Sequence, residues 1–483
     1  MASIEKNISY GFRLAIIYSI IWFVELLDAT LLNVALPEIS QYFLIDPTNA
    51  EWVLIGFLLA MVIGMLVSNP IGTYFGSRRI FLTAAWLYCV SSLACGLAPH
   101  FSELVLFRVI QGFAGGLMIP LGMQLLMSAM PQSKWVKTSS WMNVFTLLAP
   151  ALGPTLAGYI VTYLNWRWLF FAKLPLSILC AILAHFWVRY SSPQKSKRFD
   201  WVGFIFGALG LCLFILVISE VGKSRFSGGV LLALFALSIF CAIVFFWQQK
   251  RFKNPLVPLT LFRSKLFAWG NVIQSAANMI FLGATFIIAL YLQWGIGFEI
   301  VKVGWMMAAI SAGIISVMPI TAKFYNKIGP LPYMIVGLLL MSSAMFSLIF
   351  ITKQTSPVII AFIIFCEGAG SAGLQTTNFA SIFSEVPQKL RGAGSSLYTL
   401  FKQISASLGI ALSTMALTVA MRLQGIPTLT TSSPKELFYL PLALLGTIPL
   451  LALLCCFFID NKRALHYTKS QDHLETEIEE GIE

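Results

Sequence analysis

Apolar segments about as long as a membrane-spanning helix recur along the whole chain, separated by short polar segments. A bilayer core of ~30 Å requires ~20 apolar residues in a helix. Backbone polar groups in lipid must bond internally, and the alternating pattern of a membrane β-barrel is absent, so the segments are predicted to be helices. We predict fourteen spans, at about 14–36, 51–72, 79–98, 102–128, 139–163, 170–189, 201–219, 228–247, 267–294, 303–322, 332–351, 357–383, 394–421 and 438–459.

The fourteen predicted spans fall into groups of six, two and six. Basic polar segments at 189–198 and 250–265 separate these groups. The loops after the second span of each six-span group are similar, with "NPIGTYFGSRR" at 69–79 and "AKFYNKIGP" at 322–330. Two six-helix bundles related as repeats, with a substrate site between them near the middle of the membrane, are typical of transporters that work by alternating access.

These boundaries define four predicted parts of the chain. They are an N-terminal six-helix bundle at 1–190, a linker with two extra transmembrane helices at 191–262, a C-terminal six-helix bundle at 263–465, and a disordered acidic cytoplasmic tail at 466–483. The tail is polar, and such a segment cannot bury enough apolar surface to fold alone. The predicted fold is therefore all-α, with fourteen transmembrane helices.

Composition and charge agree with a membrane protein. Of the 483 residues, 58% are hydrophobic and 11% are charged, whereas charged residues make up about a quarter of a soluble domain. The net charge is +12, but 22 of the 32 Lys and Arg residues lie on the N-terminal side of the predicted membrane, seven lie on the other side and three lie in or near spans. By the positive-inside rule both termini are cytoplasmic. The basic residues therefore indicate topology, and no nucleic-acid partner is expected.

The sequence carries no signature of an enzyme, a metalloprotein or an ATP-driven pump. The eight cysteines lie in apolar segments without disulfide or metal-ligand spacing, and the four histidines are scattered. The glycine-rich phosphate loop of ATP-driven pumps does not occur. We therefore expect no enzymatic activity, no metal and no cofactor.

Two acids and one base lie where spanning helices are usually apolar. Glu25 and Asp28 share a face of the first span, and Arg108 lies in the fourth span at nearly the depth of Asp28. A charge at this depth costs about 2.5–3.5 kcal/mol, so these groups should face protein or a water-filled cavity. We predict Asp28 as the leading proton carrier, Glu25 as a second carrier or cation contact, and Arg108 as the fixed counter-charge. Protons would then be the coupling ion, and the bundle at 1–190 would be the proton-coupling half. The alternative is a static ion pair that joins the two spans.

Polar residues in several spans predict a substrate cavity near the middle of the membrane. Lipid would penalise polar groups at these positions, so they should line an interior. The candidates are Gln111, Asn271, Gln274, Asn278, Glu367, Asn378 and Lys402. The alternative for the polar face of the ninth span is hydrogen bonding between helices. An ion pair between Glu367 and Lys402 is also predicted.

Small residues recur at every fourth position of the fifth span, beside a second row of proline and glycine. The two rows are Ala149, Gly153 and Ala157, and Pro150, Pro154 and Gly158. Small residues let helices approach closely, and prolines bend a helix. The rows predict either a rigid, leak-tight seam used in a transport cycle or ordinary close packing. Gly112 and Gly116 of the fourth span predict close packing alone.

Five segments match signature sequences of a known family of membrane proteins. They are "LDATLLNVALP" at 27–37, the R-x-x-Q-G spacing at 108–112, "APALGPTLAG" at 149–158, "WRWLFFAKLP" at 166–175 and "YLQ" at 291–293. Together they resemble the major facilitator superfamily, in particular its fourteen-helix family of drug:proton antiporters of the multidrug efflux type.

The resemblance implies further sites. It implies an antiporter motif at Pro150, Gly153, Pro154 and Gly158. It also implies a cytoplasmic gating loop with Gly76, Arg78 and Arg79, in which Thr73 stands where the family has Asp.

The resemblance also implies a function. It implies a proton-coupled exporter of amphipathic organic compounds or drugs in a bacterial inner membrane. The expected partners are a small organic substrate and the lipid bilayer, the chain is expected to be a monomer, and it can act alone or with an envelope adaptor protein. Two alternatives stay open, namely a dedicated exporter of one metabolite or siderophore, and a transporter-like receptor or sensor that does not transport.

Overall fold

The computed structural model describes residues 2–45, 47–130, 134–146, 148–190, 199–220, 226–426 and 433–461. These residues form helices joined by short connections, so the predicted all-α fold is confirmed. The basic residues 191–198 and the predicted acidic tail at 466–483 lie outside the described residues. The α-helices of the first half are α1 (Ala2–Phe43), α2 (Pro47–Ala50), α3 (Trp52–Phe75), α4 (Ser77–Leu97), α5 (Phe101–Ala129), α6 (Trp135–Thr146), α7 (Leu148–Tyr163) and α8 (Trp168–Trp187).

Eight further α-helices follow among the described residues. They are α9 (Trp201–Glu220), α10 (Gly228–Arg251), α11 (Lys265–Leu290), α12 (Ile300–Ile328), α13 (Pro330–Ile349), α14 (Pro357–Ser384), α15 (Arg391–Leu423) and α16 (Tyr439–Cys456). Single turns of tighter or wider helix lie between them, at η2 (Leu259–Arg263), η3 (Tyr291–Gly295), η4 (Gln388–Leu390) and η5 (Lys435–Phe438).

Thirteen helical segments among the described residues are long and apolar enough to cross a membrane. Each corresponds to one of the fourteen predicted spans. The fifth predicted span, at 139–163, is instead covered by the two shorter helices α6 and α7. Residue 147, between α6 and α7, lies outside the described residues, so the continuity of this span stays a prediction.

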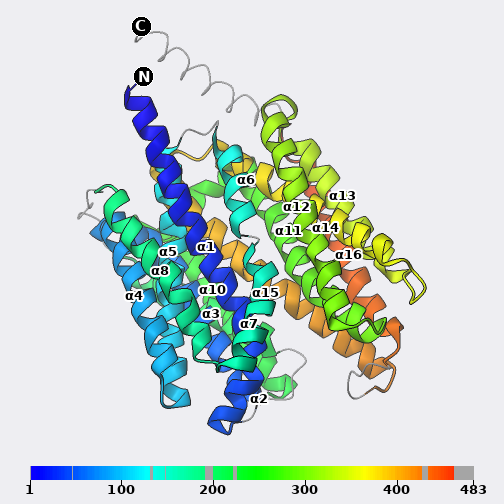
Figure 1. The fold of residues 1–483 in the computed structure, drawn as a ribbon. Coiled ribbons are helices and arrows are strands. Elements are labelled where there is room, and N and C mark those ends of the chain that lie inside the picture. The colour runs from blue at the N-terminus through cyan, green and yellow to red at the C-terminus, as the bar shows by residue number, and fades with distance from the viewer. Residues whose placement is uncertain are drawn as a thin grey trace.

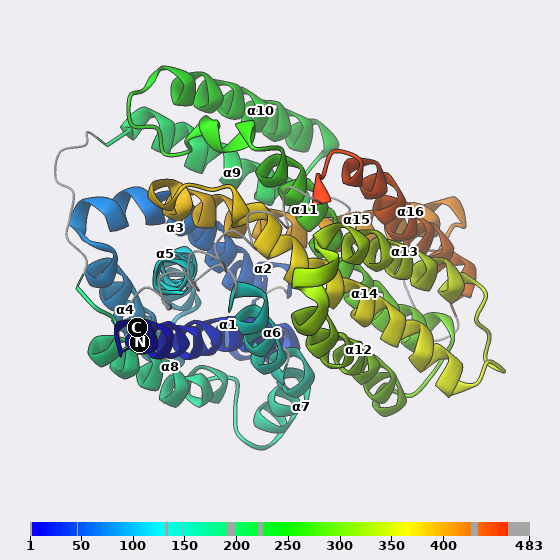
Figure 2. The same ribbon diagram turned by 90° about the horizontal axis from the view of Figure 1, so that it is seen from above.

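The helices form two groups that lie side by side (Figure 2). Helices α1 to α8 make up one group and α11 to α16 the other, and Figure 1 shows the second group tilted against the first. Helix α15 crosses the boundary and contacts α3 and α5 of the first group. Helices α9 and α10 lie together on one flank, where α9 packs against α3 and α15. The pair of extra helices thus contacts both groups through α9.

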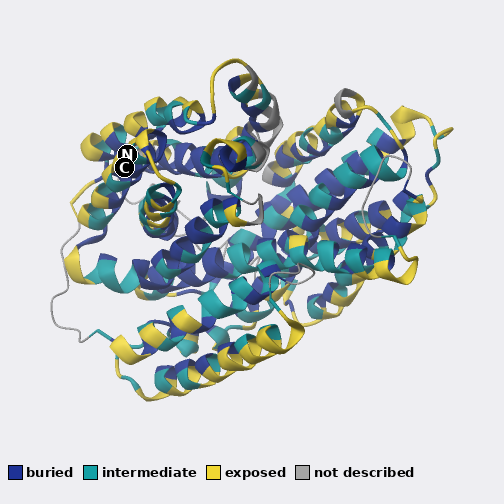
Figure 3. Cartoon of the chain, turned by 90° about the horizontal axis from the view of Figure 1, so that it is seen from below, coloured by how far each residue is buried: buried dark blue, intermediate teal, exposed yellow. Residues whose placement is uncertain are grey.

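The outer flank of α9 and α10 is apolar and exposed. Figure 3 shows this flank largely in the colour of exposed residues. Leu232, Phe240 and Ile243 of α10 are among the large apolar side chains that face outward there. Such a surface is expected of a helix that contacts lipid.

A polar cluster holds α9 and α10 together at one end. Asp200, just before α9, accepts hydrogen bonds from the side chains of Gln248 (3.0 Å) and Gln249 (2.8 Å) and from the Gly203 N–H (2.9 Å). Gln249 in turn accepts a hydrogen bond from the Val257 N–H (3.0 Å). The cluster therefore fixes both extra helices to the segment that leads to α11.

The two similar loops found in the sequence form equivalent turns. Gly76 alone separates α3 from α4, and Gly329 alone separates α12 from α13. Both glycines have a positive φ, at 94° and 83°, a backbone conformation that residues with a Cβ atom rarely adopt. The internal repeat predicted from 69–79 and 322–330 is therefore present as two matching helix–glycine–helix turns.

Glycines also let helix pairs in both groups approach until their backbones touch. A Cβ atom on Gly112 or Gly116 of α5 would overlap backbone carbonyl oxygens of α3. In the second group, a Cβ atom on Gly368 of α14 would overlap the carbonyl oxygen of Ile310 in α12. The packing role predicted for Gly112 and Gly116 is thus confirmed, and the second group repeats it.

The substitution Gly116→Ala should lower the thermal stability of the protein. The new Cβ would overlap the Met61 carbonyl oxygen, and this backbone atom can move only if α3 and α5 separate. Such overpacking costs about 1–3 kcal/mol. The measurement is the midpoint of thermal unfolding in detergent. Gly158→Ala in α7 is the control, because nothing lies within 4 Å of a Cβ there; equal midpoints for the two variants would contradict the backbone contact.

Candidate functional site

Three charged side chains from distant parts of the chain meet in one buried cluster. Asp28 of α1 accepts a hydrogen bond at Oδ2 from Arg108 Nη1 of α5 (2.7 Å) and another at Oδ1 from Lys173 Nζ of α8. Each of the three residues is at most 1% exposed. The predicted proximity of Asp28 and Arg108 is therefore present, and the pair lies inside the first helix group.

Several contacts fix the guanidinium group of Arg108. Its Nε donates to the Val53 carbonyl oxygen of α3 (3.1 Å), and its Nη1 also donates to Gln111 Oε1 one helical turn away (2.6 Å). Its Cζ lies 4.0 Å from the ring centroid of Phe57. A buried charge is stable only with such partners. The R-x-x-Q spacing thus places Gln111 where it orients Arg108.

Lys173 is a member of the cluster that the sequence analysis did not assign. Its ammonium group contacts Asp28 and lies 4.9 Å from the ring centroid of Phe170. The available signal was a lysine near the edge of a predicted span, and such a residue usually extends its charge to the interface. In the structure Lys173 is buried, so Asp28 has two basic partners.

Glu25 lies one helical turn from Asp28 but has different surroundings. It is 8% exposed and packs against Gly115 of α5. Together with Tyr88 and Ser177 it lines a small cavity of about 10 Å³ within the first group. The described residues form no ion pair with Glu25.

The two acids therefore offer different chemistry. A proton that binds to Asp28 must compete with two contacting cations, whereas a proton that binds to Glu25 breaks no ion pair of the described residues. Arg108 and Lys173 balance the two carboxylates in formal charge. A change in the protonation of either carboxyl group disturbs this charge balance and alters the forces between α1, α5 and α8.

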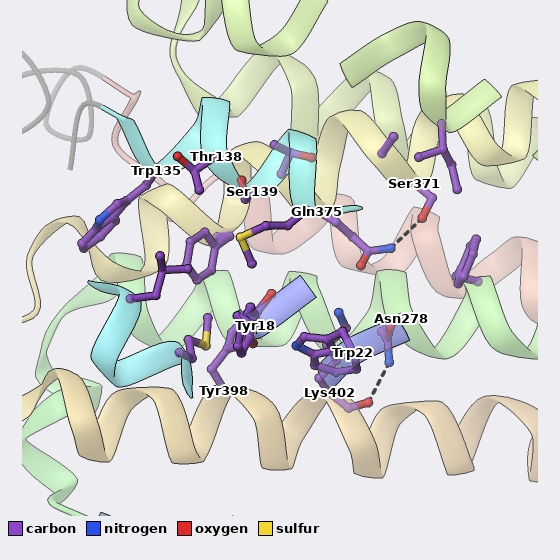
Figure 4. A pocket seen from close by; sticks show the side chains of 18 of the residues that line it. Tyr18, Trp22, Trp135, Thr138, Ser139, Asn278, Ser371, Gln375, Tyr398 and Lys402 are labelled. Carbon is purple, nitrogen blue, oxygen red and sulfur yellow. Dashed lines mark hydrogen bonds between the residues drawn. The ribbon is translucent and has the colours of Figure 1, made fainter. Parts of the chain in front are cut away.

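A larger cavity, of about 200 Å³, lies between the two helix groups. Helices α1, α5 and α6 form its wall on one side and α11, α12, α14 and α15 on the other. Figure 4 shows Tyr18 and Trp22 of α1, Trp135 of α6, and Tyr398 and Lys402 of α15 around this space. Its wall is mostly apolar and aromatic, which is usual for a site that binds an organic molecule.

Asn278 and Lys402 are the two predicted wall residues that line this cavity. Asn278 Nδ2 donates to the Lys402 carbonyl oxygen (2.6 Å), which links α11 to α15. Close by, Gln375 Nε2 donates to Ser371 Oγ (2.6 Å) on the α14 side of the wall.

Three other predicted wall residues form hydrogen bonds away from the cavity. Asn378 of α14 donates to the Gly270 carbonyl oxygen (2.8 Å) and to Gln274 Oε1 (3.3 Å) of α11, and Asn271 donates to the Phe267 carbonyl oxygen (2.7 Å). Their assignment to the wall is corrected, because none of the three lines this cavity. Their amide NH₂ groups bond within α11 or between α11 and α14, whereas Asn271 Oδ1 and Asn378 Oδ1 have no hydrogen-bond partner among the described residues. The alternative of hydrogen bonding between helices is thus present for Gln274 and Asn378.

Gln111 and Glu367 also do not line the cavity. Gln111 is occupied with Arg108. Glu367 of α14 is fully buried, and neither carboxyl oxygen has a hydrogen-bond partner among the described residues. The predicted ion pair between Glu367 and Lys402 is wrong, because Lys402 faces the cavity while Glu367 is enclosed within the second group.

The predicted antiporter motif of α7 packs closely against α1 at one of its two glycines. A Cβ atom on Gly153 of α7 would overlap the side chain of Thr30 in α1, whereas Gly158 has open space around it. The side chains of Pro150 and Pro154 lie outside the described part of the structure. Close packing between α7 and α1 is therefore seen at Gly153.

The predicted gating loop is tied to its own helix group. Arg78 donates from Nε to the Val188 carbonyl oxygen (2.6 Å) and from Nη2 to the His185 carbonyl oxygen (2.8 Å), both at the end of α8. Arg79 is exposed, and Gly76 forms the turn. These bonds hold α4 against α8.

Comparison with known proteins decides the family of this fold. A family model described as "Major Facilitator Superfamily" matches residues 18–410, which is most of the chain. The chain belongs to the major facilitator superfamily. The resemblance drawn from the five signature segments is therefore confirmed at the level of this superfamily.

Several relatives in this superfamily are similar over most of their length. YhcA of Bacillus subtilis, named as an uncharacterized MFS-type transporter, is 28% identical over 85% of this chain and 77% of its own. HsrA of Haemophilus influenzae, named as a transport protein, is 28% identical over 86% of this chain and 89% of its own. MdtD of Escherichia coli carries the name of a multidrug resistance protein and is 27% identical over 82% of this chain and 84% of its own. The protein is thus a multi-pass membrane transporter.

Solved structures share the same fold. The human organic anion transporter MFSD10 superimposes with a TM-score of 0.66 at 13% identity, over 92% of this chain and 99% of its own. The proton:xylose symporter XylE superimposes with a TM-score of 0.62 at 15% identity, over 93% and 95% of the two chains. At these identities the likeness concerns the fold.

The contact between Asp28 and Lys173 should appear as a coupling energy in a double-mutant cycle. Asp28→Asn removes the carboxylate that pairs with two buried cations. It should therefore destabilise the protein more in the background that keeps Lys173 than in the background with Lys173→Met. We expect a coupling of about 0.5–3 kcal/mol. Unfolding in mixed micelles with increasing SDS measures the free energies. Lys302, exposed on α12, is the control: Asp28→Asn and Lys302→Met should be additive, and additivity of the first pair would contradict the contact.

Proposed function

We propose that this transporter exports amphipathic organic compounds in exchange for protons, by alternating access in a bacterial inner membrane. Both termini would then lie in the cytoplasm, and the coupling ion would be the proton without any other cofactor. The names of relatives support export of this kind, since MdtD is named as a multidrug resistance protein. The chain would work as a monomer, and an envelope adaptor protein is a partner to test.

The observation that carries this proposal is the double role of α1. Trp22 and Leu26 line the cavity between the helix groups. Asp28, on the same stretch of helix, belongs to the buried charge cluster of the first group, and the buried Glu25 lies one helical turn from it. A proton that changes the ion pairs of α1 can therefore shift the same helix that forms one wall of the cavity, which is the requirement for coupling two binding events.

Contacts between the two groups supply a gate. Ser68 Oγ of α3 lies 2.8 Å from Ser396 Oγ of α15, and Ser395 Oγ donates to the Pro120 carbonyl oxygen of α5 (3.1 Å). These bonds join the end of α3 and the second half of α5 to the start of α15. In alternating access they would form in one state and separate in the other.

Asp28→Asn should abolish uphill export and keep downhill exchange. The amide cannot be ionised, so it cannot bind and release a proton. The measurement uses proteoliposomes with an imposed pH gradient and a panel of dyes, cations and organic acids, and compares accumulation with counterflow. Glu25→Gln is measured in parallel to show which carboxyl carries the proton, and Lys302→Met is the control. Uphill export that survives in both carboxyl variants would refute proton coupling at this site.

A disulfide between positions 68 and 396 should stop transport. Because the two hydroxyl oxygens are 2.8 Å apart, the double variant Ser68→Cys/Ser396→Cys should cross-link on mild oxidation and hold the groups together. Reduction should restore transport. Each single variant, oxidised in the same way, controls for the native cysteines. Full transport by the cross-linked protein would show that this contact does not need to open.

A further inference from the structure

Lys402 occupies a special place on the cavity wall. It lies on α15, half-buried, with its ammonium nitrogen 4.7 Å from the ring centroid of Trp22 across the boundary between the groups (Figure 4). Its backbone is held by the bond from Asn278. The described residues form no ion pair with it.

The charge of the cavity is therefore positive. Among the described residues that line it, Lys402 is the only one with a formal charge. The buried acids of the molecule lie elsewhere, since Asp28 and Glu25 belong to the first group and Glu367 is enclosed in the second. A second cation, Arg391, lies close by, with its Cζ 5.1 Å from the ring centroid of the lining residue Trp135.

The rest of the wall suits an aromatic or branched apolar body. Trp22, Trp135 and Phe379 supply flat surfaces, and methionines such as Met127 and Met318 supply adaptable ones. The hydroxyl groups of Thr138, Ser139 and Tyr398 lie at the same surface. Those of Thr138 and Ser139 already donate hydrogen bonds within the protein, to Met130 Sδ (2.9 Å) and to the Val136 carbonyl oxygen (3.1 Å). Such a wall binds rings of different shapes, so charge becomes the feature that discriminates between ligands.

We propose that the exported compound is an amphipathic organic anion, in which a carboxylate or sulfonate contacts Lys402 and an apolar ring system packs on the aromatic wall. This inference rests on the proposed export function and assigns its substrate class. An anion forms a charge-assisted contact with the ammonium group in a cavity of low polarity, where such contacts are strong.

A cationic substrate fits the same wall less well. Aromatic faces attract cations, but the ammonium group of Lys402 already lies over the ring of Trp22. A second positive charge in the same apolar cavity would meet repulsion and find no acid on the wall to pair with. Specificity for anions thus follows from an unfavourable contact as well as a favourable one.

Export of an anion in exchange for a proton would also depend on the membrane potential. A proton that enters and an anion that leaves both move positive charge inward. An inside-negative membrane potential therefore drives export of an anion in addition to the pH gradient. Exchange of one proton for one monovalent cation would move no net charge.

The test compares three probes with one ring system and different charges. They are 2-naphthalenesulfonate, 2-naphthalenemethanol and 2-naphthylmethylammonium, each measured for binding to the full purified chain by calorimetry and for transport in proteoliposomes. We expect the sulfonate to bind at least about tenfold more tightly than the other two, since one good ionic contact is worth about that factor. An inside-negative potassium diffusion potential should accelerate its export.

Lys402 variants assign the effect to this side chain. Lys402→Met should lower affinity for the sulfonate about tenfold and leave affinity for the neutral probe unchanged, which also shows that the variant is folded. Lys402→Arg should keep the preference for the sulfonate. The matched control is Lys302→Met, because Lys302 also lies over an aromatic ring, 4.3 Å from the Phe298 centroid, but lies outside the cavity.

Two outcomes would overturn the inference without touching the proposed function. One is proton-driven export of the ammonium probe in preference to the sulfonate. The other is an unchanged preference for the sulfonate in Lys402→Met. Failure of the proposed function would give a different result. The sulfonate would still bind through Lys402, but its addition would cause no proton movement in proteoliposomes with the wild-type chain.

Discussion

The low polarity of the membrane interior is the constraint on which this structure depends. A charge there is stable only if the protein supplies its partners. Asp28 receives them from two helices that are far apart in the sequence, through Arg108 of α5 and Lys173 of α8. Arg108 in turn needs the Val53 carbonyl oxygen of α3. One carboxylate thus fixes the relative positions of four helices. Because these helices are held through its charge, a change in its ionisation would affect all four.

The two helix groups differ in how they carry buried charge. At corresponding positions, beside a glycine that packs on the neighbouring helix, the first group has Gln111 and the second has Glu367. Gln111 accepts a hydrogen bond from Arg108, whereas the carboxyl group of Glu367 has no hydrogen-bond partner among the described residues. The two ion pairs of Asp28 therefore lie in the first group, while Lys402 is the charged residue that the second group contributes to the described cavity wall.

The sequence predicted the fold well because hydropathy, basic-residue bias and turn glycines each act locally. It predicted that Asp28 and Arg108 meet because both lie at similar depth. It could not predict Lys173, since depth along a helix does not say which way a side chain turns. The polar stripe of α11 failed for a related reason: Gln274 bonded to α14 and Asn278 on a cavity wall produce the same pattern in the sequence. Only the neighbouring helix distinguishes them.

Separation of the charge cluster from the cavity has a mechanical consequence. In the proposed exchange, proton and substrate would bind at separate places, so they would not compete directly for one carboxylate as they would in a common site. Their coupling would then have to pass through a helix that has two arrangements. Helix α1 is placed for this role, because Trp22 opposes Lys402 of the second group while Asp28, nearly two turns further, is held by the first. A small rotation or shift of α1 that accompanies loss of its ion pairs would move Trp22 against Lys402, and so change the cavity at the contact where an anion would bind.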